Sequence, residues 1–125
     1  MKNLKNKNKN IFNSFKYAFE GILEAFKTER NLKIHVIIMI LVIIFGVILN
    51  ISKTEWIICI LLFGAVISSE LFNTAIETTV DLITMEKNPK AKLAKDVSAG
   101  AVLVMAIVSA IIGLMIFLPK IVRFM

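Results

Sequence analysis

The sequence predicts an all-α integral membrane protein, with an N-terminal amphipathic surface helix followed by three transmembrane helices. Hydrophobic residues make up 58% of its 125 positions, above the roughly 45 to 50% that is usual in soluble domains. Two nearly uninterrupted apolar segments, 34–51 and 97–118, have the length of about 17 to 25 residues that crossing a bilayer requires. Residues 1–125 are therefore expected to form a single membrane domain.

The segment 11–28 is expected to form the surface helix. Its large apolar side chains recur at helical spacing, and charged side chains occupy the adjoining arc. The apolar set is Phe12, Phe15, Phe19, Ile22, Leu23 and Phe26. Residues 1–10 are expected to be a basic tail rather than part of a cleaved signal peptide, because no apolar core and no small-residue cleavage site follow them.

The second transmembrane helix is expected to span 56–85, although only its first part is apolar. The run 56–67 is wholly apolar. A helix of that length rises only about 18 Å, whereas a hydrocarbon core is about 30 Å thick. The span must therefore continue into a segment that carries polar and acidic side chains. These are Glu70, Asn73, Glu77 and Asp81.

Basic residues predict the orientation in the membrane. Lysine and arginine are abundant before residue 34 and again between 87 and 95, whereas the first loop carries only Lys53. The positive-inside rule then places the N-terminus and the second loop in the cytoplasm. Lys120 and Arg123 fall on the far side, which a short C-terminal tail can accommodate.

The net charge of +6 does not indicate a nucleic-acid partner, because the basic residues lie at the ends of apolar spans. Anionic lipid headgroups are the expected partners of these residues. Cys59 stands alone in an apolar span, so the chain offers no disulfide framework. His35 is the single histidine and lies near the start of the first span. With no partner evident in the sequence, we interpret it as structural or interfacial.

The four polar residues of the second span fall on one helix face, within an arc of about 80° at 100° per residue. Each ionisable group at membrane depth costs about 2.5 to 3.5 kcal/mol, so three carboxylates require cations or a partner. Beside the lysines of the second loop they are placed to hold Mg²⁺ and a polyphosphate, since magnesium binds one or two carboxylates plus phosphate oxygens. The same spacing also suits acids that pair with lysines between helices, as in a small cation-binding transporter or assembly subunit. Periodicity does not decide between these interpretations.

Four stretches of the chain form a specific pattern. They are Thr28-Glu29-Arg30-Asn31 before the first span, Glu70-Leu71-Phe72-Asn73-Thr74-Ala75-Ile76-Glu77 in the second, Ala94-Lys95-Asp96 in the second loop and Phe117-Leu118-Pro119-Lys120 at the end. With them the sequence resembles the prokaryotic diacylglycerol kinase and undecaprenol kinase family over nearly everything after residue 14. The final stretch looks like the Gram-positive undecaprenol kinase branch.

The resemblance implies a lipid kinase of the bacterial cell membrane that uses ATP as co-substrate and Mg²⁺ as cofactor. Glu70 would be the general base for the lipid hydroxyl, and Glu29 and Glu77 would bind the magnesium. Asp81 is a further acid on the same helix face. The resemblance also implies a homotrimer with sites shared between subunits. The implied nucleotide-binding positions are Tyr17, Glu29, Asn73, Glu77, Glu86, Lys95 and Asp96.

The expected reaction is the phosphorylation of undecaprenol to undecaprenyl phosphate, with diacylglycerol to phosphatidic acid as the alternative. The residues themselves do not rank these lipids, because an apolar groove discriminates poorly between chain lengths. One position departs from the family pattern, since Glu20 stands before Gly21 where many relatives carry a basic residue. This acid puts the expected contacts of the surface helix with nucleotide or headgroup in doubt.

Overall fold

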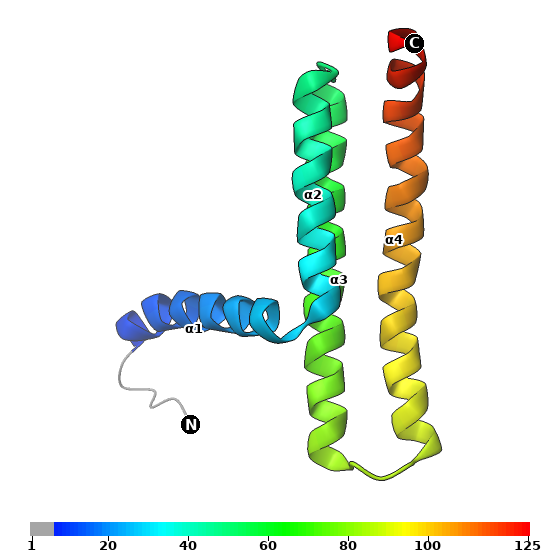
Figure 1. The fold of residues 1–125 in the computed structure, drawn as a ribbon. Helices are drawn as coiled ribbons and strands as arrows, with labels where there is room; N and C mark the ends of the chain where they lie inside the picture. The colour runs from blue at the N-terminus through cyan, green and yellow to red at the C-terminus, as the bar shows by residue number, and fades with distance from the viewer. Residues whose placement is uncertain (1–6) are drawn as a thin grey trace.

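A computed structural model describes residues 7–125, which form four α-helices joined by short connections (Figure 1). Within this part of the chain there is no strand, so the all-α prediction is confirmed. Three of the helices, α2 to α4, are long and apolar enough to cross a membrane. The helices are α1 (Lys7–Thr28), α2 (Arg30–Ile48), α3 (Lys53–Ile83) and α4 (Pro89–Phe124).

Two of the helices begin before the segments that the sequence marks as surface helix and membrane span. α1 begins at Lys7, within the expected basic tail 1–10, whose first six residues lie outside the described part. α4 begins at Pro89, eight residues before the expected membrane span 97–118, because Asn88 caps it. The Asn88 side chain accepts hydrogen bonds from the backbone N–H groups of Lys90 and Ala91. Proline suits the first position of a helix, where its missing N–H costs nothing.

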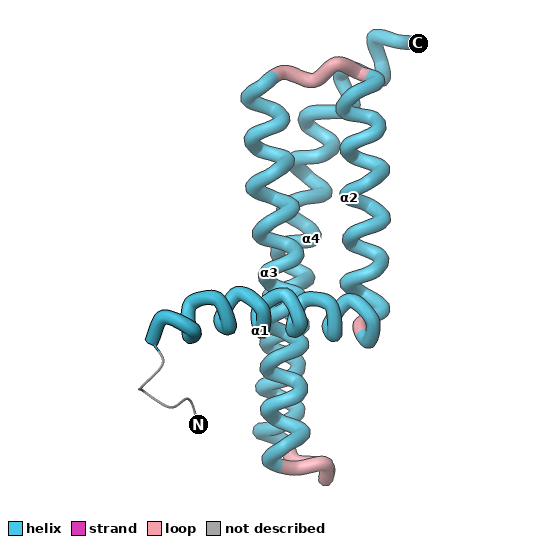
Figure 2. The backbone as a smooth tube through the Cα atoms, turned by 90° about the vertical axis from the view of Figure 1, so that its left-hand side faces the viewer, coloured by secondary structure: helices cyan, strands magenta, loops and turns pink. Residues whose placement is uncertain are grey.

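The helices α2, α3 and α4 run side by side, and α1 runs crosswise to them, out to one side of the bundle (Figures 1 and 2). Both views show α3 and α4 continuing past the level of α1 to their connecting loop. The 31 residues of α3 and 36 of α4 exceed what the membrane needs, since about 20 residues cross a core of about 30 Å. Because α1 has the pattern of an interfacial helix, we infer that the α3–α4 hairpin projects beyond the hydrocarbon core.

The connection between α2 and α3 is a tight turn. Asn50 adopts a φ of 51°, in the left-handed region that asparagine tolerates better than most residues. Ser52 and Glu55 then form a reciprocal capping box at the start of α3. Close to this turn, a Cβ added to Gly46 would lie 2.6 Å from the ring of Trp56. A glycine is therefore required where α2 meets this ring.

The apolar core lies at this same end of the bundle, where Ile51, Cys59 and Ile116 are buried together. An ion pair of 3.1 Å between Lys120 and Glu55 joins the end of α4 to the start of α3. Lys120, on the far side from most lysines, thus has an acidic partner. Most other large apolar side chains are exposed in a single chain, as expected for helices that face lipid or further copies.

Candidate active site

The acidic face of α3 begins deep in the bundle and becomes more exposed toward the α3–α4 loop. Glu70 is 2% exposed and Asn73 is 7% exposed. Glu77 is half-buried, and the side chain of Asp81 is 42% exposed. The first half of the face therefore points at protein rather than at lipid, and the second half is open.

Glu70 contacts His35, which lies near the start of α2. The distance from His35 Nε2 to Glu70 Oε1 is 3.1 Å, and 18% of the histidine side chain is exposed. Among the described residues, Glu70 Oε1 accepts no aligned hydrogen bond, so this contact is a close approach of two ionisable groups. The sequence shows a histidine near the start of an apolar span, but it does not show which residue of another helix that histidine meets.

Asn73 joins α4 to the next turn of α3. Ser98 of α4 donates its hydroxyl to Asn73 Oδ1 at 2.6 Å, and Asn73 Nδ2 donates to Glu77 Oε1 at 3.3 Å. Ser98 is itself buried, with 6% of its surface exposed. The amide of Asn73 is therefore oriented from both sides. Sequence reasoning missed Ser98, because a small hydroxyl residue in an apolar helix has no distinctive pattern.

Glu29 lies at the junction of α1 and α2, in the N-cap position of α2 but without a side-chain capping hydrogen bond. Both Glu29 and Glu77 lie close enough to Glu70 for their charges to act on it. The described residues contain no cluster of three or more acidic, histidine or cysteine side chains that could hold a metal ion. Magnesium in nucleotide sites takes one or two carboxylates, and phosphate oxygens complete its shell. Two carboxylates such as Glu29 and Glu77, whose charges both act on Glu70, would fit that donor set.

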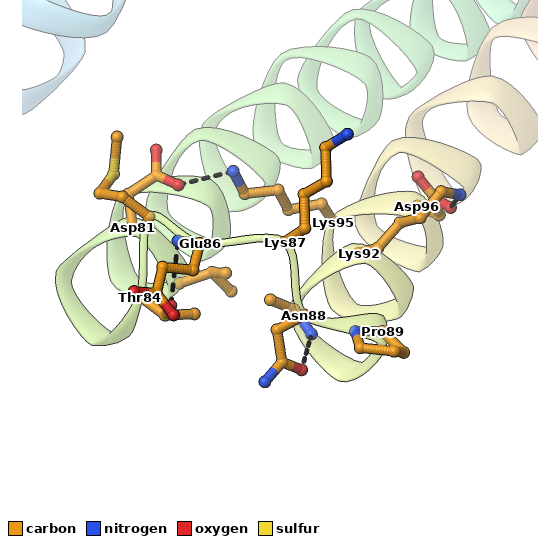
Figure 3. Close-up of a pocket in the computed structure, with 12 residues that line it drawn as sticks. Asp81, Thr84, Glu86, Lys87, Asn88, Pro89, Lys92, Lys95 and Asp96 are labelled. Carbon is orange, nitrogen blue, oxygen red and sulfur yellow. Dashed lines mark hydrogen bonds and ion pairs between the residues drawn. The ribbon is translucent and has the colours of Figure 1, made fainter.

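An open groove of about 740 Å³ lies at the α3–α4 hairpin (Figure 3). Across this groove Lys95 Nζ meets Asp81 Oδ1 at 2.5 Å, so a charge from α4 pairs with the acidic face of α3. Lys92 and Asp96 form a second, more exposed pair along α4. The charged and polar lining is Asp81, Thr84, Glu86, Lys87, Asn88, Lys92, Lys95 and Asp96.

The predicted site residues thus form two groups. The first group lies near Glu70: the charges of Glu29 and Glu77 act on it, and Asn73 hydrogen-bonds to Glu77. The second group lines the hairpin groove and consists of Asp81, Glu86, Lys95 and Asp96. The groups adjoin, since Asp81 follows Glu77 by one helical turn. Tyr17 belongs to neither group: it lies on α1, is 54% exposed, and forms no hydrogen bond or ion pair with the other described residues.

The alternative that the acids only pair with lysines is supported at one position. Asp81 has a lysine partner, but Glu70 contacts a histidine and Glu77 accepts a hydrogen bond from an amide. In residues 10–125, where side chains are described, neither glutamate has a lysine within ion-pair distance. The deeper acids are therefore not neutralised as simple structural ion pairs.

An apolar groove of about 480 Å³ runs between α2, α3 and α4. His35 lies at one end of its lining, and Phe117 lies toward the other end of the bundle. Most of the wall is aliphatic or aromatic, and it includes Ile38, Val42 and Phe63. The groove therefore leads along the membrane-spanning helices to the histidine that touches Glu70.

Comparison with known proteins identifies the family. The family model described as prokaryotic diacylglycerol kinase matches residues 16–117. The chain belongs to this family. It is 50% identical to an undecaprenol kinase of Bacillus subtilis over 119 residues, which are 95% of this chain and 97% of that protein. It is 38% identical to a diacylglycerol kinase of Synechocystis over 117 residues, 93% of this chain and 67% of that one.

A diacylglycerol kinase of Pseudomonas aeruginosa is 33% identical over 93 residues, which are 74% of this chain and 76% of that protein. The resemblance seen in the sequence is confirmed, and the chain is a membrane lipid kinase. Its phosphoryl donor is ATP, as kinase chemistry requires. The prediction of an enzyme is therefore confirmed, in place of a transporter or assembly subunit.

The link between Ser98 and Asn73 generates a stability prediction. Ser98→Ala leaves a buried amide oxygen without its donor, which costs about 1 to 3 kcal/mol. Ser109→Ala is the matched control on the same helix, because within the described residues the buried Ser109 Oγ has no hydrogen-bond partner. Unfolding in mixed micelles should show a lower free energy of unfolding for Ser98→Ala only. Equal stability of the two variants would contradict this interpretation of the bond.

Proposed function

We propose that this lipid kinase phosphorylates undecaprenol to undecaprenyl phosphate, using Mg-ATP. The observation that carries the proposal is the buried Glu70, which lies between an apolar groove ending at His35 and a more exposed row of nucleotide-site candidates. The choice of lipid is supported by 50% identity to the Bacillus subtilis undecaprenol kinase over almost the full length of both chains. Phosphorylation of diacylglycerol to phosphatidic acid is the alternative, supported by the other relatives.

Glu70 acts as the general base in this proposal. The oxygen of the lipid hydroxyl forms a bond to the γ-phosphorus of ATP, and the bond from that phosphorus to the oxygen of ADP breaks. The hydroxyl proton passes to the Glu70 carboxylate, and ADP leaves with the electron pair of the broken bond. Burial keeps this carboxylate away from water, and a positioned base typically contributes about 10² to 10⁴-fold to the rate.

Glu29 and Glu77 are the proposed ligands of Mg²⁺. The bound ion would offset the negative charge of the phosphates during transfer. Asn73, oriented by Ser98, and the groove residues Lys95, Glu86 and Asp96 are the proposed nucleotide contacts, together with Tyr17. Lys95 is held against Asp81 in the structure, so phosphate oxygens would compete with that carboxylate for its charge.

The apolar groove is the proposed site for the lipid chain. A chain lying along it, with its hydroxyl toward His35, places the reacting oxygen beside Glu70. The rest of a long chain extends into the bilayer, where the exposed apolar faces of the helices already require lipid or protein contacts. The proposed assembly is a homotrimer with sites shared between neighbours, and the mass of the solubilised protein would test that number.

A direct assay tests the reaction. Purified protein in micelles receives Mg-ATP together with undecaprenol, with diacylglycerol, or with no lipid. We expect undecaprenyl phosphate to form at a higher kcat/KM than phosphatidic acid. A preference for diacylglycerol would establish the alternative substrate. An absence of both products would overturn the proposed lipid kinase reaction.

The proposed topology has the N-terminus and the α3–α4 loop in the cytoplasm, where ATP is available. Lysine-rich loops favour the cytoplasmic side. Single cysteines at Lys53 or Lys90, in a Cys59→Ala background, would be labelled on intact cells with a membrane-impermeant maleimide. We expect Lys53→Cys to react and Lys90→Cys to react only after the cells are opened. The opposite pattern would invert the topology.

The different roles proposed for Glu70, as the base, and Glu77, as a ligand of Mg²⁺, predict different kinetics for two neutral variants. Glu70→Gln keeps the side-chain volume and removes the base, so kcat should fall by at least about a hundredfold while the KM for ATP changes little. Glu77→Gln should also raise the KM for ATP and the concentration of Mg²⁺ that gives half-maximal rate. The measurement is steady-state kinetics at saturating lipid, which gives kcat and the KM for ATP for the wild type and both variants. A near-normal kcat for Glu70→Gln would show that the base lies elsewhere.

A further inference from the structure

His35 is an ionisable side chain at the site for which the proposed reaction has assigned no role. Its Nε2 lies 3.1 Å from Glu70 Oε1, and both side chains are largely removed from solvent. The other charged groups near Glu70 are the acids Glu29 and Glu77, both of which repel its negative charge. In the part of the chain whose side chains are described, His35 is the one residue within ion-pair distance of Glu70 that can carry a positive charge.

The packing of α2 holds this histidine in place. Leu32, one turn earlier on the same helix, is 2% exposed. Gly46 lies three to four turns further on and meets the Trp56 ring of α3. Positions 32, 35, 39, 42 and 46 recur at intervals of three and four, so they share one face of α2. His35 is therefore fixed on the side of α2 that faces α3 and the apolar groove.

We propose that His35 is a positioning residue for Glu70, an inference that rests on the proposed role of Glu70 as the base. Its Nε2 engages Oε1 of the carboxylate, which leaves Oε2 to receive the proton of the lipid hydroxyl. A glutamate side chain has several rotatable bonds, and a buried carboxylate without a partner is costly. Contact with the imidazole restricts the carboxylate to one orientation.

Two substitutions separate positioning from a purely structural role. His35→Gln retains a side-chain N–H group that can engage the carboxylate, whereas His35→Leu keeps an apolar volume and removes the contact. Misplacement of a catalytic group by about 1 Å can cost up to about a hundredfold in rate. We expect His35→Leu to lower kcat by about 10- to 100-fold with the KM for ATP nearly unchanged, and His35→Gln to recover most of that loss.

A double-variant cycle tests whether the effect passes through Glu70. In the Glu70→Gln background, His35→Leu should cause no further loss of kcat, because the base that it positions is already absent. Ile37→Leu, at an exposed site of α2, is the control and should leave kcat unchanged in both backgrounds. The proposal would be overturned if His35→Leu lowered kcat by the same factor in the wild-type and in the Glu70→Gln background. It would also be overturned if the kcat of His35→Gln were as low as that of His35→Leu. An inactive wild-type enzyme would instead overturn the proposed function.

Discussion

The cost of placing carboxylates at membrane depth is the constraint on which the rest of the structure depends. An ionisable group there requires protein partners, because lipid offers none. α3 meets this requirement by turning its acidic face toward α2 and α4, so that Glu70 lies against His35 and Asn73 against Ser98. The extensive packing of α3 on α4 and the position of α2 then follow from the need to cover this face as well as from apolar burial.

The same constraint orders the face by depth. Glu70 is the most buried residue of this acidic face. The acids become more exposed with each turn toward the hairpin, where Asp81 forms an ion pair with Lys95 in an open groove. Glu70 and Glu77 are separated along the axis by about 10 Å, at 1.5 Å per residue. One helix can therefore present the buried carboxylate of Glu70 to a lipid alcohol and the more exposed carboxylate of Glu77 to a nucleotide. This geometry explains why the two neutral variants are expected to differ in their kinetics.

Properties that depend on neighbours along the chain could be predicted from the sequence. Apolar run lengths predicted the three long helices, and the three- and four-residue spacing predicted the shared face of Glu70 and Glu77. The apolar span 97–118 does not mark the start of α4 at Pro89, because hydropathy reports where a helix enters lipid and not where it begins. The contacts of His35 and Ser98 could not be predicted, since they depend on how α2 and α4 are rotated against α3. Only the three-dimensional arrangement supplies that rotation.

Stability and chemistry are concentrated at different ends of the bundle. The apolar core, the close contact of Gly46 with Trp56 and the Glu55–Lys120 ion pair all lie toward the α2–α3 turn. The hairpin groove at the opposite end is lined mainly by polar and charged side chains, and its ion pairs are partly exposed, so each contributes little to folding. A charge-removing substitution in the hairpin groove therefore disturbs the electrostatics of the reaction more than the framework that holds the helices. Glu70 and His35 lie outside this groove and are largely buried, so a loss of turnover there is attributed to the reaction only where the variant keeps the assembly and stability of the wild type.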